Sequence, residues 1–221
     1  MPGKNVIKIY TLGGFYHVYN RGVEKRKIFI DALDCGMFLT YLQNYLTPPT
    51  LKQVRPVRKS NLYKELKLIA YCLMPNHLHL LLQQITTTGM TNFMRCITNA
   101  YTAYFNQRRH RTGPLFQGRY KAKLILEENY LLSLTRYIHR NPIDLSPDYH
   151  ANLSLYPYSS YQEYLAQRNT GWIDHRVILN YFKSNRKEGH SRSISYRSFV
   201  EEEEVDEDVP ALEISKEMAL E

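Results

Sequence analysis

Residues 66–84, LKLIAYCLMPNHLHLLLQQ, are the most strand-like stretch of this 221-residue chain and decide its fold. Nearly every residue in it is apolar, and Met74-Pro75-Asn76 divides it into two runs. Proline cannot donate a backbone hydrogen bond to a sheet and is common in turns. The stretch therefore predicts two consecutive strands joined by a turn.

The segments on either side of this hairpin complete the order strand, helix, strand, strand, helix, strand. Alternating or β-branched runs predict the strands, and apolar residues at helical spacing predict the helices. This order predicts an α+β fold: a ferredoxin-like βαββαβ sandwich with an antiparallel sheet and its main helices on one face. The other elements are a strand at 15–21, a helix from Asp31 to Pro48-Pro49, a helix at 90–107, a strand at 118–126, and helical additions at 127–140 and 158–184.

The charge of the chain is divided unevenly. The net charge is +8, but residues 201–221 carry −9, so residues 1–200 carry +17. We predict one domain over 1–200 and a disordered acidic tail over 201–221. A body this basic favours a nucleic-acid partner over a basic protein that is merely soluble. The tail either only solvates the protein or mimics DNA and competes for the basic surface.

The sequence also excludes several classes of protein. No apolar run approaches the roughly 18 residues of a membrane helix, and the N-terminal residues lack the apolar stretch of a signal peptide. The three cysteines form no CxxC pair, which argues against a zinc site and a disulfide framework. We expect a cytoplasmic, nucleoid-associated protein with no membrane contact.

His77 and His79 are candidate metal ligands. Side chains alternate along a strand, so the two imidazoles share one face at about 6 to 7 Å between Cα atoms, while Leu78, Leu80 and Leu82 face the other way. Two imidazoles so placed can hold one divalent ion. A bare His-x-His is more often structural or solvated, but polar rings on so apolar a strand are costly without a partner.

Tyr101 is a candidate nucleophile in the helix that follows. Its plainest interpretation is a core residue in the apolar stripe of that helix, beside Ile97 and Tyr104. If the helix covers the histidine face, however, the phenol meets the metal. A tyrosyl oxygen can attack a metal-polarised phosphodiester and form a covalent phosphotyrosine.

A basic segment at 107–123, QRRHRTGPLFQGRYKAK, is a candidate DNA-binding surface. Aromatic rings stack on bases and cations neutralise phosphates, as expected for single-stranded nucleic acid. The competing interpretation is a solvated edge strand protected by its lysines. The candidate DNA-binding residues are Arg21, Arg108, Arg109, Arg111, Phe116, Arg119, Tyr120, Lys121 and Lys123.

Taken together, these residues resemble the single-tyrosine HUH (IS200-like) transposases, and more closely their REP-associated tyrosine transposase branch. The resemblance covers about residues 15–160, and its motifs are specific in combination. They are YHVYNRG at 16–22, CLMPNHLHLLL at 72–82, AYTAYFNQRRHRTGPLFQGRYKAKLI at 100–125, YLLSLTRYIHRNPI at 130–143 and YPYSSY at 156–161.

The resemblance implies roles for these residues. His77 and His79 would bind Mg²⁺ or Mn²⁺, and Tyr101 would form a 5′-phosphotyrosine and free a 3′-hydroxyl. Family enzymes take a third ligand from the tyrosine helix, usually one turn after the tyrosine. That position is Phe105, which cannot coordinate, so Asn106 is the substitute. The implied partner is single-stranded DNA with a hairpin, bound by a monomer or homodimer.

Two other functions remain open from the sequence. One is a nucleic-acid-binding protein of the same fold that has lost turnover, which Phe105 favours. The other is a two-histidine phosphoesterase acting on RNA ends. That class needs two separated His-x-Thr/Ser motifs, and this chain has only one His-x-His.

Overall fold

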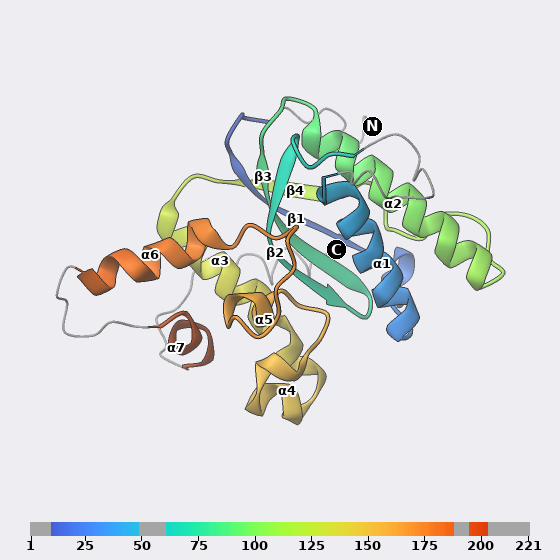
Figure 1. The fold of residues 1–221 in the computed structure, drawn as a ribbon. Helices are drawn as coiled ribbons and strands as arrows, with labels where there is room; N and C mark the ends of the chain where they lie inside the picture. Colours follow the sequence, from blue (N-terminus) through green and yellow to red (C-terminus); the bar gives the residue numbers. More distant parts are fainter. Residues whose placement is uncertain (1–9, 49–60, 188–194, 203–221) are drawn as a thin grey trace.

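The computed structural model describes residues 10–48, 61–187 and 195–202 and is built on one four-stranded antiparallel sheet (Figure 1). The strands run in the spatial order β2-β3-β1-β4. Pro75 and Asn76 form the turn between β2 and β3, as the sequence predicts. The predicted ferredoxin-like βαββαβ order is confirmed. The strands are β1 (Phe15–Arg21), β2 (Leu66–Met74), β3 (His77–Gln84) and β4 (Lys121–Ile125).

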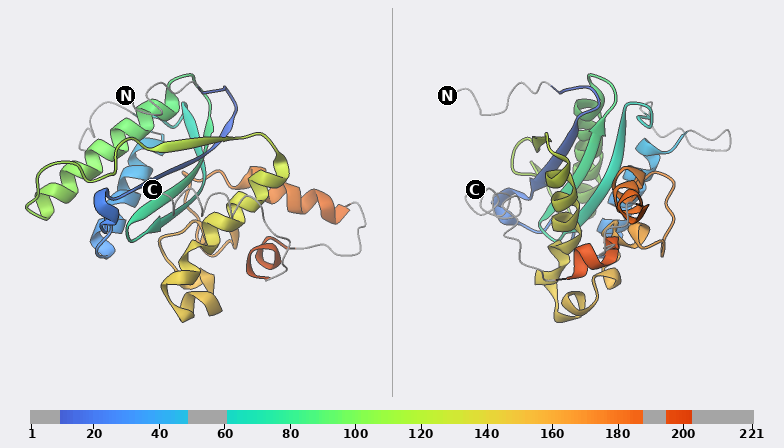
Figure 2. Two further views of the ribbon diagram at one scale, coloured as in Figure 1. Left: turned by 180° about the vertical axis from the view of Figure 1, so that it is seen from behind. Right: turned by 90° about the vertical axis from the view of Figure 1, so that its left-hand side faces the viewer.

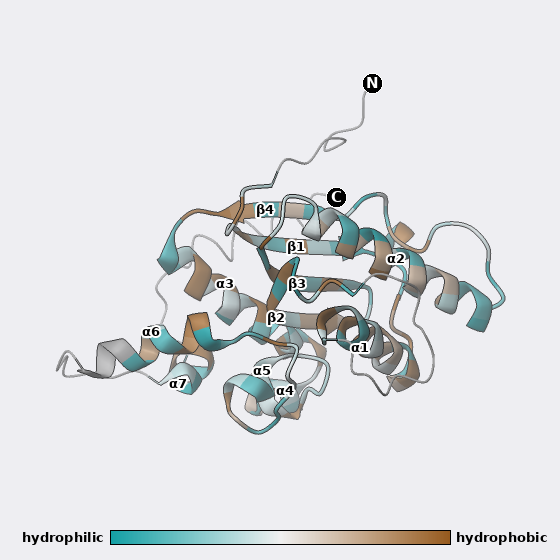
Figure 3. Ribbon diagram, turned by 45° about the horizontal axis from the view of Figure 1, so that its top comes forward, coloured by the Kyte–Doolittle hydropathy of each residue, from teal (hydrophilic) through white to brown (hydrophobic). Residues whose placement is uncertain are grey.

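Helices α1 (Ala32–Leu46) and α2 (Gly89–Arg108) cover one face of this sheet. Asp31 caps α1 by accepting a hydrogen bond from the backbone of Asp34. Leu78, Leu80 and Leu82 of β3 are fully buried beneath the two helices. Figure 3 shows the corresponding hydrophobic colouring where β2 meets α1. This layer holds the main helices, as predicted.

The opposite face is covered by α3 (Glu128–Arg140) and by short helices that follow it. The sheet therefore lies between two helical layers, with α2 and α3 on opposite sides (Figure 2). The short elements are η1 (Val23–Lys25) near β1, and then η2 (Asn141–Leu145), α4 (Pro147–Ala151), η3 (Leu153–Leu155), α5 (Tyr161–Tyr164), α6 (Arg176–Lys187) and α7 (Tyr196–Glu201).

The segment that follows α4 also covers the outer edge of β2. The backbone amides of Ser160 and Asp174 donate to carbonyls of β2, and the amide of Leu73 donates to the carbonyl of Tyr158. An edge strand covered in this way is protected from pairing with other chains. β4 is the other edge strand of the sheet.

Three predicted elements differ from the structure. The helical addition predicted at 158–184 is two helices, α5 and α6, separated by turns and irregular chain at 165–175. β4 begins at Lys121, later than predicted, because Gly118 adopts a positive φ of 69° in the turn that precedes it. The acidic segment begins inside a folded element, since α7 runs through Glu201, whose carboxylate accepts a hydrogen bond from Tyr161. Residues 203–221 of the predicted tail lie outside the described residues. Across the part of the chain that is described, no helix is long and apolar enough to cross a membrane.

Candidate active site

His77 and His79 share one face of β3, as the sequence predicts, and this face lies toward α3. Their ring centroids are 4.9 Å apart and the rings are perpendicular. On the neighbouring strand, Arg21 pairs in register with His77, and Tyr19 pairs with His79. The histidines thus lie between β1, β2 and α3 and not beneath α2.

One ring nitrogen of His79 has a hydrogen-bond partner among the described residues, and the other has none. Its Nδ1 lies 2.9 Å from Nε2 of His17 on β1, within hydrogen-bonding distance. Its Nε2 is buried and has no hydrogen-bond partner among the described residues. Burial, then the neighbouring His77 and His17, lowers the pKa of His79 well below its usual value, so the ring is neutral at pH 7. A neutral imidazole with one orphaned, oriented nitrogen fits a divalent cation.

His77 lies beside two asparagines. Its Nδ1 lies 2.7 Å from Oδ1 of Asn76. Burial lowers the pKa of His77 to about 4; the nearby side chain of Asn141 opposes this shift, and the charge of Arg21 adds to it. The Asn141 amide also donates to the carbonyl of Tyr137, at 2.8 Å. His77 is therefore a second neutral imidazole, and Asn141 brings an amide side chain to it from the end of α3.

Tyr137 of α3 is the tyrosine that meets the histidines. Its ring lies edge to face on His79, with centroids 5.4 Å apart, and on His17, with centroids 6.4 Å apart. Residues four apart lie on the same side of a helix, so Tyr137 and Asn141 approach the pair together. Sequence reasoning assigned neither residue a role. The available signal was their four-residue spacing within TRYIHRNPI, which matches a tyrosine followed one turn later by a polar residue.

Tyr101 lies on the other side of the sheet, and the expectation that it meets the histidines is wrong. It belongs to α2, and its fully buried side chain points toward α1, where its hydroxyl donates to the carbonyl of Ile28 at 2.5 Å. Its ring packs against Phe29 and Phe38. The apolar stripe of α2 packs on the leucine face of β3, because that face buries the apolar surface, and the histidines point away from it.

Asn106 does not reach the histidines either. Its amide donates to the carbonyl of Gly113, and its oxygen accepts from Arg111. These bonds close the loop after α2, on the helix side that faces away from α3. The expectation that Asn106 is the third ligand is therefore wrong. Within residues 10–48, 61–187 and 195–202, no group of three His, Cys, Asp or Glu side chains could hold a metal.

Three predicted DNA-binding residues lie on the histidine face. Arg21 pairs with His77 across the β1–β3 ladder. Lys121 and Lys123 of β4 pair with Tyr19 and His17. Burial and the charge of Lys123 lower the pKa of His17 to about 3. The histidines thus have cations on two neighbouring strands.

Three others support the fold instead. Arg108 and Arg109 both form ion pairs with Asp31 and with the fully buried Asp34, and so fasten the end of α2 to the start of α1. The Asp31 pairs hold the pKa of that carboxyl well below its usual range, chiefly through Arg108. Arg111 lies over the ring of Phe105 and bonds to Asn106. The basic run at 107–111 is thus largely engaged within the protein.

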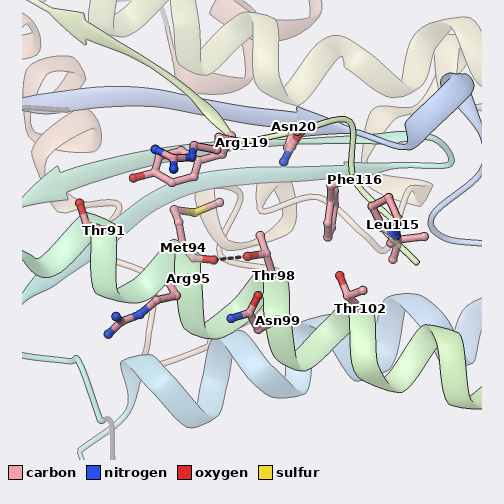
Figure 4. Close-up of a pocket in the computed structure, with 13 residues that line it drawn as sticks. Asn20, Thr91, Met94, Arg95, Thr98, Asn99, Thr102, Leu115, Phe116 and Arg119 are labelled. Carbon is pink, nitrogen blue, oxygen red and sulfur yellow. Dashed lines mark hydrogen bonds between the residues drawn. The ribbon is translucent and has the colours of Figure 1, made fainter. Parts of the chain in front are cut away.

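The remaining three, Phe116, Arg119 and Tyr120, line a cavity of about 790 Å³ between α2 and the segment before β4 (Figure 4). Met94 and Leu115 contribute further apolar lining. This cavity is on the α2 side of the sheet, so the predicted DNA-binding residues divide among the histidine face, the α1–α2 ion pairs and this cavity.

The chain is similar to one protein family and to two solved structures. Residues 39–141 match the family model described as "Transposase IS200 like". A solved REP-associated tyrosine transposase, bound to a REP hairpin, is similar with a TM-score of 0.52 at 13% identity, over 78% of this chain and 98% of that one. A protein from Deinococcus radiodurans R1, described as a transposase, has a TM-score of 0.38 and 17% identity, over 63% of this chain and 96% of its own. No curated protein sequence matches the chain. At 13% identity, the first similarity shows a shared fold.

Proposed function

Because this chain belongs to the IS200-like transposase family, we propose that it cleaves and rejoins single-stranded DNA beside a hairpin through a covalent tyrosine intermediate. The observation that carries this proposal is the position of Tyr137, whose ring lies 5.4 Å from that of His79 on the face of the sheet that also carries His77. A phenol beside two neutral imidazoles places a candidate nucleophile next to candidate metal ligands, the combination that metal-assisted attack on a phosphodiester uses.

In the proposed reaction, Tyr137 is the nucleophile. Its phenolic oxygen loses its proton and attacks the scissile phosphorus. The bond from phosphorus to the 3′ oxygen breaks, and that oxygen takes up a proton. The products are a 5′-phosphotyrosine and a free 3′-hydroxyl. A 3′-hydroxyl from the same or another strand then attacks the phosphotyrosine, so rejoining reverses the step and needs no nucleotide cofactor.

His77, His79 and Asn141 are the residues we propose to hold a divalent ion, Mg²⁺ or Mn²⁺. The fit rests on the buried Nε2 of His79, which has no partner in the described structure, and on the contact of Asn141 with His77. When bound, such an ion offsets negative charge on the phosphate oxygens. His17 orients His79 through its Nδ1, as outer groups commonly do for metal-binding histidines.

Arg21, Lys121 and Lys123 are proposed to hold the DNA backbone against this face. Lysine and arginine side chains neutralise phosphates and supply much of the affinity for nucleic acid. The similar solved protein is bound to a REP hairpin. We propose a hairpin-bearing single strand as the partner of this chain too, bound by a monomer or homodimer.

The alternative of a binding protein without turnover was favoured by Phe105. That residue is 2% exposed and packs in the core with Tyr101, on the other side of the sheet from the histidines. Asn141 occupies the corresponding position, one turn after Tyr137. The feature that favoured an inactive protein therefore has no bearing on this site.

The experiment uses a 5′- or 3′-labelled DNA hairpin with single-stranded flanks, incubated with the protein and Mn²⁺. We expect a covalent protein–DNA band on a denaturing gel, carrying the strand 3′ to the cut, and no band when a chelator is present. Tight hairpin binding with no cleavage and no adduct would support the binding protein instead. Cleavage of a matched RNA without an adduct would support the phosphoesterase.

A further inference from the structure

The residues that line the cavity beside α2 include apolar, aromatic and basic side chains. Such residues suit a ligand that has a flat aromatic ring attached to a negatively charged backbone. Its apolar surface includes Met94, Leu115 and Phe116, and Tyr120 adds a second ring. Figure 4 shows Phe116 and Arg119 above the cavity and Thr91, Arg95 and Asn99 along α2 below it. At about 790 Å³ it has the size of pockets that enclose small ligands.

We infer that this cavity binds one unstacked base of the single-stranded DNA next to the hairpin, which deepens and rests on the proposed function. A paired and stacked base has both faces covered, so only a base of a single strand can offer a face to Phe116 or Tyr120. Asn20 and Asn99 supply amide groups that both donate and accept hydrogen bonds, as base edges require.

The charges around the cavity match a phosphate backbone. Arg95 lies on the exposed side of α2, and Arg119 lies on the opposite wall, so a nucleotide entering between them meets a cation on each side. Aromatic and cationic groups combined in this way are typical of single-strand binding.

β4 connects this cavity to the histidine face. Tyr120 and Ala122 pack toward the α1–α2 layer, while Lys121 and Lys123 pair with Tyr19 and His17. A single strand that passes over the β4 edge can therefore reach both the cavity and the histidine face, so the bound base and the phosphate that Tyr137 attacks belong to the same strand.

The wall that carries Phe116 is fixed before DNA arrives. Phe116 forms a backbone bridge with Gly22, and the amide of Gln117 donates to the carbonyl of Arg21. Arg21 also donates to the side chain of Gln117, at 2.6 Å. A preformed wall lowers the ordering cost of binding.

The test compares Asn99→Trp, which fills the mouth of the cavity, with Ala103→Trp, a matched change at an exposed α2 position outside it. The probe is a labelled hairpin with a single-stranded flank, followed by fluorescence anisotropy without metal. We expect Asn99→Trp to weaken binding about 10-fold and Ala103→Trp to leave it within twofold, since stacking of one base is worth about 1–3 kcal/mol. Circular dichroism checks that both variants fold.

A series of flanks, each with one abasic site, then locates the base. In the wild type and in Ala103→Trp, an abasic site at one position of the flank should weaken binding about 10-fold. In Asn99→Trp the same abasic site should have no further effect. Equal binding by the two tryptophan variants, or the same abasic profile in both, would overturn the inference. Failure of the proposed function has a different signature, because the covalent adduct would be absent while this binding pattern remained.

Discussion

The rings of His79 and Tyr137 meet edge to face, perpendicular and with centroids 5.4 Å apart, although 58 residues separate them in the chain. Tyr101 is only 22 residues from His79, yet it belongs to α2, which covers the opposite face of the sheet. The proximity of His79 to Tyr137 comes from α3 returning over the histidine face. This contact moves the proposed nucleophile from one helix to another.

The first prediction compares the two tyrosines. Tyr137→Phe keeps the ring but removes the attacking oxygen, so we expect no covalent adduct and a cleavage rate at least about 1,000-fold lower. Tyr101→Phe should cleave within twofold of the wild type and lose about 1–2 kcal/mol of unfolding free energy, because the buried carbonyl of Ile28 loses its donor. Gel assays and urea titrations measure both. An adduct that persists in Tyr137→Phe and disappears in Tyr101→Phe would return the nucleophile to α2.

The second prediction concerns Asn141. Asn141→Ala removes the side chain that contacts His77, and we expect the affinity for Mn²⁺ to fall about 10-fold or more. Titration calorimetry without DNA measures this directly. Asn106→Ala is the matched control and should leave Mn²⁺ affinity unchanged, because Asn106 bonds to the loop after α2. A loss of affinity only in the control would show that the metal lies elsewhere.

The third prediction separates the lysines of β4 from the arginines of α2. Lys121→Ala and Lys123→Ala should each weaken binding to single-stranded DNA and reduce the slope of log affinity against log salt by about 0.7. Arg109→Ala should leave that slope unchanged, since its guanidinium is engaged by Asp31 and Asp34. Anisotropy at four salt concentrations provides the slopes. A reduced slope for Arg109→Ala alone would mean that its ion pairs open to bind DNA.

The fourth prediction concerns stability. The Asp34 carboxylate is fully buried and accepts hydrogen bonds from Arg108, Arg109 and the amide of Ile30. Asp34→Ala leaves the amide of Ile30 unpaired and leaves Arg108 and Arg109 with only Asp31 as a carboxylate partner, and we expect a loss of about 2 kcal/mol in unfolding free energy. Urea unfolding at pH 7 measures the change. Asp31→Ala, at a half-exposed carboxylate, should cost less, and equal losses would show that burial of Asp34 adds nothing.

Local pattern was sufficient for much of the fold. The two-residue period of a strand places His77 and His79 together and Leu78, Leu80 and Leu82 opposite them, whatever the rest of the protein does. The Pro75-Asn76 turn and the Asp31 cap are equally local, since backbone geometry and one side chain decide each of them. The sequence by itself therefore determined the hairpin, the element order and the histidine face.

Only the tertiary structure decided which tyrosine meets those histidines. The chain has 19 tyrosines, and helical spacing marks the apolar side of α2 without saying which sheet face it covers. Burial of apolar surface sends that side to the leucines and leaves the histidine face to α3. The same holds for Arg108 and Arg109. Their position in a basic run predicts DNA binding, but both pair with Asp34, which lies more than 70 residues away in the chain. Contacts between residues so far apart in the chain depend on how the helical layers pack on the sheet. The spacing of residues within one helix or strand does not specify that packing.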